Sequence, residues 1–99
     1  MELRINPLVV SDLQAIKTFI EEDKIISAQE TIMKIYKCFE LLKSFPKIGA
    51  QLSKRVSFKT DYRYYVSGNY VVLYRINGNY VDIYRVIDRH LDITGILFR

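Results

Sequence analysis

The spacing of apolar residues changes near residue 62 from the period of a helix to the period of a strand, and this change constrains the fold most. Before that point, one stripe with intervals of three and four consists of Val9, Leu13, Ile16 and Ile20. Beyond it, runs rich in tyrosine, valine and isoleucine cover residues 62–66, 70–76 and 80–87. The order of these segments predicts helices in the first part of the chain and consecutive strands in the second.

The chain begins with the pattern of a short strand followed by a helix. Leu3 and Ile5 flank a polar residue in strand-like alternation. Asn6 can then cap a helix, and Pro7 occupies the first helical position, where its missing N–H costs nothing.

A second helix is predicted from Ser27 to the residues before Pro46. Ser27 and Glu30 have the spacing of a capping box, in which each side chain bonds the backbone N–H of the other residue. Pro46 ends the helix, and Gly49 is expected to supply a left-handed turn. The short connection between the two helices predicts that they lie antiparallel.

The three later runs predict an antiparallel meander, because turn residues separate them at 67–69 and 77–79. A turn centred on 77–78 and a turn centred on 78–79 give registers one step apart. The second register places Arg75 directly opposite Asp82, and the sequence does not decide between the two.

A short C-terminal helix is predicted from Asp92 through Phe98, with Asp92 as its cap. The expected fold is therefore a single α+β domain of residues 1–99. Two antiparallel N-terminal helices pack on one face of a twisted antiparallel β-sheet, and the short helix follows the last strand.

Composition excludes several classes of protein. With 99 residues, a single cysteine, Cys38, and a single histidine, His90, the chain can form neither an internal disulfide framework nor a zinc cluster of soft ligands. No metal or cofactor is expected. The chain contains no run of eighteen apolar residues and no apolar segment typical of a signal peptide, so a cytoplasmic protein is expected.

Positive charge is concentrated in the second part of the chain. Residues 1–53 carry seven basic and seven acidic side chains, whereas residues 54–99 carry eight basic and four acidic ones, which gives the net charge of +4. Seven of the eight tyrosines lie between Tyr62 and Tyr84. Arginine beside aromatic residues suits phosphate contacts and base stacking, but tyrosine is also an ordinary residue of half-buried strands.

Three segments resemble the RelE/ParE toxins of bacterial type II toxin–antitoxin modules. Residues 80–98 look like the last strand, basic pair and short apolar helix of that family, residues 45–49 like the end of its second helix, and residues 62–64 like the opening of its meander. The resemblance implies an antitoxin as partner. It also implies one of two mechanisms, because RelE-like members cut mRNA on the ribosome, whereas ParE-like members poison DNA gyrase.

The ribonuclease mechanism needs proton transfer at the 2′-hydroxyl and the leaving oxygen, and positive charge at the phosphate. His90 is suited to proton transfer near neutral pH, and Arg89 beside it is suited to hold the phosphate. The ribonuclease members place a catalytic arginine or histidine at this strand end. Together with Arg63, which opens the meander, these are the expected catalytic residues.

The expected RNA-binding residues are Lys54, Arg55, Lys59, Asp61 and Tyr84. Asp61 is also the nearest carboxylate for a base, unless it pairs with a neighbouring arginine. Arg75 and Arg85 lie within predicted strands and are expected to pair across them with Asp82.

Two positions depart from the RelE pattern. Val71 stands after Tyr70 where RelE has an arginine, and the closing segment has no aromatic residue before Phe98. The favoured interpretation is a metal-independent, ribosome-dependent mRNA endoribonuclease that acts with ribosome and mRNA. The alternatives are a gyrase inhibitor without catalytic activity and an inactive toxin remnant that only binds antitoxin.

Overall fold

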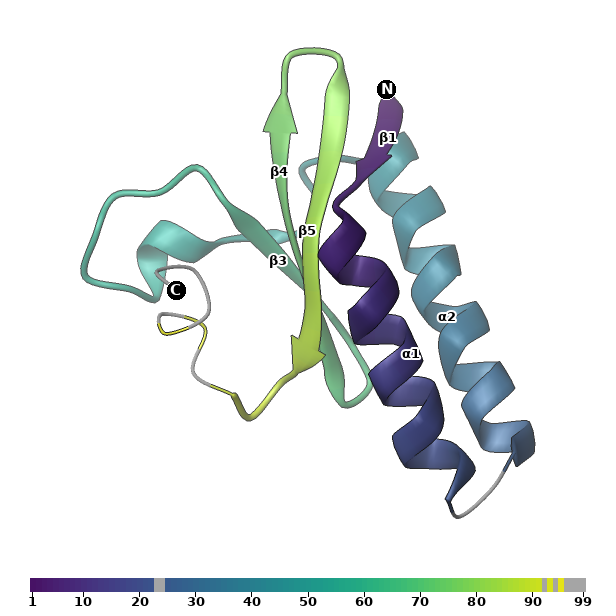
Figure 1. Ribbon diagram of the computed structural model, residues 1–99. Helices are drawn as coiled ribbons and strands as arrows, with labels where there is room; N and C mark the ends of the chain where they lie inside the picture. The colour runs from purple at the N-terminus through teal and green to yellow at the C-terminus, as the bar shows by residue number, and fades with distance from the viewer. Residues whose placement is uncertain (23–24, 92, 94, 96–99) are drawn as a thin grey trace.

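The computed structural model describes residues 1–22, 25–91, 93 and 95. Its elements are, in chain order, β1 (Glu2–Ile5), α1 (Pro7–Glu21), α2 (Ile25–Ser44), β2 (Ala50–Gln51), a short 3₁₀ helix η1 (Leu52–Lys54), β3 (Arg63–Ser67), β4 (Tyr70–Asn77) and β5 (Tyr80–Asp88). Figure 1 shows α1 and α2 side by side and antiparallel on one side of the sheet, with η1 on the other side. The α+β class, the two helices and the meander are as the sequence predicts.

The sheet is mixed, so the expectation of a purely antiparallel sheet is wrong. Its strand order is β1-β5-β4-β3-β2, and β1 runs parallel to β5 while all other neighbours are antiparallel. The backbone N–H of Asn6 still donates to the carbonyl of Ile83 at 3.0 Å, and the chain then enters α1, which packs along the rest of β5. The parallel direction of β1 therefore places α1 over the sheet.

The core lies between the helices and one face of the sheet. The predicted stripe of the first helix is confirmed, because Val9, Leu13 and Ile16 are buried. They pack in one cluster with side chains of α2 and of the strands, which include Ile35, Phe39, Leu42, Val72, Tyr74, Val81, Ile83 and Val86. This burial of apolar surface is the main force that holds the helices on the sheet.

The two helix starts differ in how well the sequence predicts them. Asn6 caps α1 as expected, and its side-chain oxygen accepts a hydrogen bond of 2.9 Å from the N–H of Leu8. In α2 the predicted capping box is wrong, because the helix begins at Ile25 and Ser27 lies inside it. An interior serine costs a helix little, and each added residue gains a backbone hydrogen bond, so the helix extends past it.

The β4–β5 hairpin adopts the second of the two predicted registers. Asn77 is opposite Tyr80, so Gly78 and Asn79 form the turn, and Gly78 has φ of 59° as the first position of a two-residue turn requires. Arg75 lies opposite Asp82. The predicted C-terminal helix over 92–98 lies largely outside the described residues.

Gly49 is needed for close approach, and the predicted left-handed turn at this position is wrong. Its φ is not positive, but its N–H donates to the hydroxyl oxygen of the fully buried Tyr74 at 3.0 Å. The Tyr74 hydroxyl in turn donates to the carbonyl of Pro46 at 2.7 Å. This hydroxyl therefore holds the connection after α2 against the sheet, next to the short strand β2, which the sequence does not predict.

Candidate functional site

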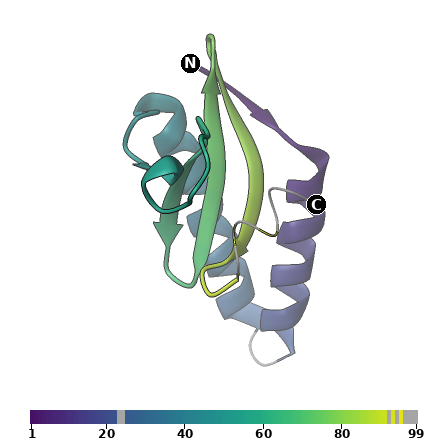
Figure 2. The ribbon, with the colours of Figure 1, turned by 90° about the vertical axis from the view of Figure 1, so that its left-hand side faces the viewer.

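The sheet face opposite the helices carries arginine and tyrosine side chains. Strand alternation places Val72 and Tyr74 against the helices, so Leu73 and Arg75 face the other way. Figure 2 looks toward this face, with η1 in front of the strands. Its centre is a small apolar cluster of Val71, Leu73 and Ile87, against which Tyr64, Tyr84 and Ile93 pack.

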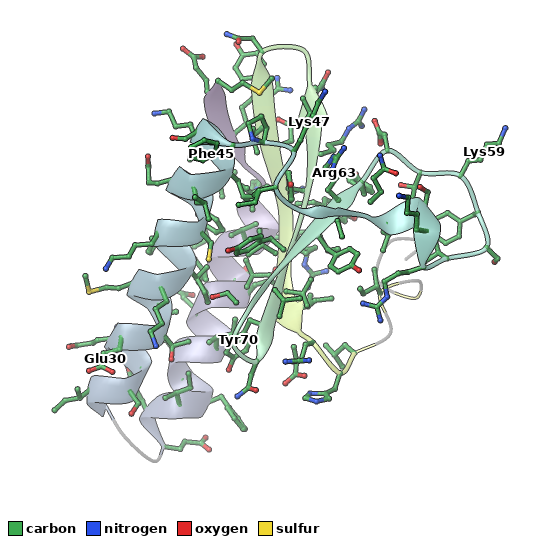
Figure 3. All side chains as sticks on the ribbon, turned by 180° about the vertical axis from the view of Figure 1, so that it is seen from behind. Glu30, Phe45, Lys47, Lys59, Arg63 and Tyr70 are labelled. Atoms are coloured by element: carbon green, nitrogen blue, oxygen red, sulfur yellow. The ribbon has the colours of Figure 1, made fainter. Side chains whose placement is uncertain are left out.

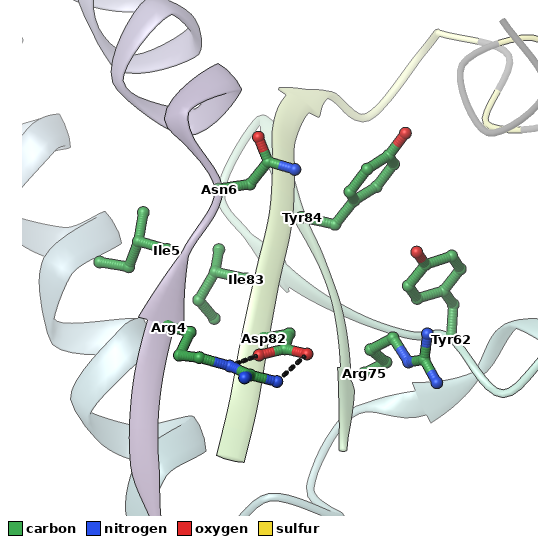
Figure 4. A pocket seen from close by; sticks show the side chains of 8 residues that line it. All are labelled: Arg4, Ile5, Asn6, Tyr62, Arg75, Asp82, Ile83 and Tyr84. Carbon is green, nitrogen blue, oxygen red and sulfur yellow. Dashed lines mark hydrogen bonds and ion pairs between the residues drawn. The ribbon is translucent and has the colours of Figure 1, made fainter. Parts of the chain in front are cut away.

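Two hollows open on this side of the molecule. The first, with a volume of about 330 Å³, is named here the tyrosine pocket and is lined by Arg4, Asn6, Tyr62, Arg75, Asp82 and Tyr84, with two isoleucines (Figure 4). The second, of about 290 Å³, is named the Arg55–Arg89 pocket, and its aliphatic lining includes Leu52, Val56, Val66 and Leu91. They differ in how the charges of their arginines are compensated.

The arginines of the tyrosine pocket already have carboxylate partners. Arg4 makes a two-pronged ion pair with Asp82, with distances of 2.7 and 3.0 Å, and lies 4.0 Å from the centre of the Tyr80 ring. Arg75 binds Asp61 at 3.0 Å. The expected pairing of Asp82 with Arg75 or Arg85 is therefore wrong, because the neighbouring strand β1 brings Arg4 directly alongside Asp82.

The ion pair with Arg4 should be visible in an acid titration. The hydrogen bonds from the Arg4 guanidinium hold the pKa of Asp82 below its usual value, and the Asn77 side chain contributes in the same direction. A lowered folded-state pKa stabilises the fold above about pH 4, and this contribution is lost as the pH falls through the folded-state pKa. Replacing Arg4 with glutamine should raise the pKa of Asp82, as followed by the carboxyl carbon shift in NMR. An unchanged pKa would contradict the pairing.

Two tyrosines form the aromatic part of the tyrosine pocket. Tyr62 and Tyr84 stack with ring centres 5.4 Å apart and planes 15° apart, and the Arg75 guanidinium lies 5.8 Å from the Tyr62 ring centre. Two residues predicted to bind RNA are therefore linked by a chain of contacts. Asp61 binds Arg75, and the Tyr62 ring lies between the Arg75 guanidinium and Tyr84. The sequence does not indicate this tyrosine pair, because Tyr62 and Tyr84 come from different ends of the meander.

The Arg55–Arg89 pocket brings together two of the predicted site residues. Arg55 lies 5.3 Å from the Tyr64 ring centre, and its Nη1 is 3.4 Å from the Tyr64 hydroxyl. The backbone N–H of Arg89 donates to the Asn69 carbonyl at 2.9 Å, and its Nη1 is 3.4 Å from the Gly68 carbonyl. Within the described part of the chain, neither guanidinium has a carboxylate within 4.0 Å.

Arg63 lies apart from that pocket and binds backbone. Its Nη1 donates to the carbonyl of Gly49 at 2.8 Å and lies 3.4 Å from the carbonyl of Lys47. Figure 3 shows Arg63 beside Lys47, while Lys59 projects from the outermost loop. Lys54 is an exposed residue at the end of η1.

His90 is held by Asp88 just beyond the end of β5. Oδ1 of Asp88 accepts from the His90 backbone N–H at 2.8 Å and lies 2.9 Å from His90 Nδ1. These contacts, with the backbone one the stronger, lower the pKa of Asp88. The His90 side chain is 79% exposed. Although Arg89 and His90 are neighbours in sequence, their side chains contact different groups, the Gly68 carbonyl and the Asp88 carboxylate.

Among the residues that the structure describes, no three side chains of His, Cys, Asp or Glu gather as metal ligands would. Neither α1 nor α2 has the length and hydrophobicity that crossing a membrane requires, as judged over the same residues.

Comparison with known proteins identifies the family. A solved structure described as "Chromosomal ParDE TA system from P. aeruginosa" matches with a TM-score of 0.72 and 19% identity, over 89% of this chain and 95% of that chain. A search of curated protein sequences finds no significant match. The family model described as "ParE toxin of type II toxin-antitoxin system, parDE" matches residues 3–93. The chain therefore belongs to the ParE toxin family of type II toxin–antitoxin systems.

Proposed function

We propose that this toxin acts by binding DNA gyrase in the cytoplasm and not by cutting mRNA. The observation that carries this proposal is the ParE family match over residues 3–93, since ParE-like toxins are the gyrase-directed branch of the wider family that the sequence resembles. The proposal reverses the preference drawn from sequence, which favoured the ribosome-dependent endoribonuclease.

The arrangement of the expected catalytic residues supports this choice. A ribonuclease site needs its proton donor, its base and its phosphate-binding groups around one phosphate. Arg63 instead donates to backbone carbonyls after α2, and the exposed His90 is bound to Asp88. Of the expected catalytic residues Arg63, Arg89 and His90, only Arg89 lines either of the two hollows.

Ribonuclease activity stays the second candidate because of the Arg55–Arg89 pocket. Two guanidiniums without a carboxylate partner in the described residues are suited to a phosphate group. If the chain cuts RNA, these two arginines, and not Arg63, are the residues positioned to hold the scissile phosphate.

The antitoxin that family membership implies has a suitable surface on the helix pair. Apolar side chains that are exposed on α1 and α2 include Phe19, Ile26, Met33 and Tyr36. We propose that the antitoxin covers part of this surface, since exposed apolar groups of this size on a monomer are typical of a protein interface.

An in vitro assay separates the two mechanisms. Purified toxin added to gyrase, ATP and relaxed plasmid should inhibit supercoiling and leave linear DNA after detergent and protease treatment. Antitoxin added first should prevent both effects and serves as the control. The same preparation should leave mRNA on programmed ribosomes intact, as followed by toeprinting. New cuts at A-site codons with no effect on gyrase would overturn the proposal in favour of the ribonuclease.

A further inference from the structure

We propose that the Arg55–Arg89 pocket binds a carboxylate of an acidic peptide segment, with an apolar side chain of that segment against the aliphatic wall. The occupant is thus a protein partner that presents glutamate or aspartate beside an apolar residue. This inference goes beyond the proposed function, because it concerns the ligand chemistry of one pocket whichever target the toxin has.

The first argument is the difference in charge between the two hollows. In the tyrosine pocket each arginine already binds a carboxylate of this chain, Arg4 with Asp82 and Arg75 with Asp61. Among the described residues, Arg55 and Arg89 have no carboxylate within 4.0 Å, and the charge of Asp88 acts on Arg89 only from beyond that distance. Their side-chain polar contacts there are a hydroxyl and a backbone carbonyl at 3.4 Å. An anion from another molecule would therefore gain most at the Arg55–Arg89 pocket.

The second argument is that the Arg55 side chain and the backbone at Arg89 are held in place. The Tyr64 ring supports Arg55, and the short backbone hydrogen bond to Asn69 fixes the chain at Arg89. An arginine that is placed in advance, as Arg55 is on the Tyr64 ring, loses less side-chain entropy when it binds a carboxylate with two parallel hydrogen bonds.

The third argument, the aliphatic lining, favours a peptide over a nucleic acid. Val66 and Leu91 remain 43% and 55% exposed, and Leu52 closes the pocket from η1. None of the described residues that line the pocket is aromatic, so this part of its wall offers no ring on which a base could stack. Arginine is enriched at protein interfaces, and the aliphatic side chains around this pair would bury apolar surface under an apolar residue of a bound peptide.

The test uses NMR on the purified full chain, labelled with ¹⁵N, and the peptide acetyl-Leu-Glu-Val-amide as probe. The Nε–Hε signals of Arg55 and Arg89 should shift in a saturable way, and the signal of the ion-paired Arg4 should not. The matched peptide with glutamine in place of glutamate should bind about tenfold more weakly or not at all, because it lacks the charge-assisted hydrogen bonds. Arg89→Gln should weaken binding of the glutamate peptide by a similar factor.

Control measurements separate the specific site from general charge attraction. Lys34→Gln removes one positive charge from the outer side of α2 and should leave the affinity for the glutamate peptide unchanged. Inorganic phosphate and a thymidine dinucleotide are the competing probes. The proposal is overturned if these two shift the Arg55 and Arg89 signals while the glutamate peptide does not, or if both peptides bind equally. The peptide titration does not depend on whether the toxin inhibits gyrase. The proposal for this pocket and the proposed function can therefore fail independently of each other.

Discussion

Replacing Asp12 with alanine is expected to lower the free energy of unfolding by about 3 kcal/mol. The Asp12 carboxylate accepts two hydrogen bonds of 2.8 Å from the Arg85 guanidinium and one of 3.0 Å from the backbone N–H of Val86. The Asp12 side chain is only 10% exposed and that of Arg85 26%. The substitution would therefore leave a largely buried charge and a strand N–H without their acceptor.

The position of Asp12 in the fold explains why three donors meet there. β1 pairs with β5 only as far as Ile83, so the edge of β5 beyond that residue has no neighbouring strand. The Asp12 carboxylate on α1 accepts the hydrogen bond that Val86 would otherwise donate to a neighbouring strand. The hydrogen bonds with the same carboxylate raise the pKa of Arg85. Loss of Asp12 should thus loosen the contact between α1 and the sheet.

Asp61→Ala is the matched control for this prediction. Asp61 also pairs with an arginine, Arg75, but its side chain is 63% exposed, and exposed pairs contribute about 0–1 kcal/mol. Urea unfolding of the wild type and both variants measures the two losses at equal m-values. Equal losses in the two variants would show that Asp12 acts only as a surface partner of Arg85.

The two long helices and the strands of the meander could be predicted from the sequence because each depends on local spacing. The change of period near residue 62, the Asn6 cap and the three strand runs all appear in the structure. The direction of β1 could not be predicted, since the alternation of Leu3 and Ile5 is identical when the strand is read in either direction. The structure runs it parallel to β5, and the two strands are joined by the long connection through both helices and the strands β2, β3 and β4.

The ion pair of Asp82 could not be predicted because it depends on that direction. Cross-strand reasoning gave Asp82 a partner within the meander, but parallel β1 brings Arg4 beside it. A register shift in β5 changes the neighbours further, since Leu73 lies opposite Arg85 while Tyr74 lies opposite Ile83. The extra residue in β5 interrupts the alternation of faces, which the sequence pattern does not reveal.

The candidate site was predictable in composition and not in grouping. Arg55 and Arg89 were expected to contact nucleic acid, and the fold brings them to one pocket because the end of β5 returns beside the residues that precede β3. Arg63 has the same residue type and lies nearer to Arg55 in sequence, yet it donates to the Gly49 carbonyl. Residue type indicates which side chains can hold an anion, whereas strand order decides which of them meet.

Gly49→Ala is expected to lower the free energy of unfolding by about 2–3 kcal/mol, because the added methyl group has no space. A Cβ at this position would lie 2.8 Å from the backbone carbonyl of Tyr64 and would collide with the Tyr74 hydroxyl. Neither neighbour can move easily, since Tyr64 belongs to β3 and the Tyr74 hydroxyl is bonded to the Pro46 carbonyl. The same collision should push the Tyr74 ring outward, which adds a spectroscopic signature to the loss of stability.

Gly68→Ala separates this steric cost from the cost of a left-handed backbone. Gly68 has φ of 60° with no atom within 4 Å of an added Cβ, so alanine there should cost about 1 kcal/mol through backbone strain alone. Burial raises the pKa of Tyr74, so in Gly49→Ala this pKa should fall toward its ordinary value, while in Gly68→Ala it should not change. Denaturant unfolding measures the two losses, and because the chain has eight tyrosines, the NMR shift of the assigned Tyr74 ring carbon follows its phenol. If both variants lose the same stability and the Tyr74 pKa stays raised in both, then the connection after α2 yields to the methyl group, and the Tyr74 hydroxyl does not hold it in place.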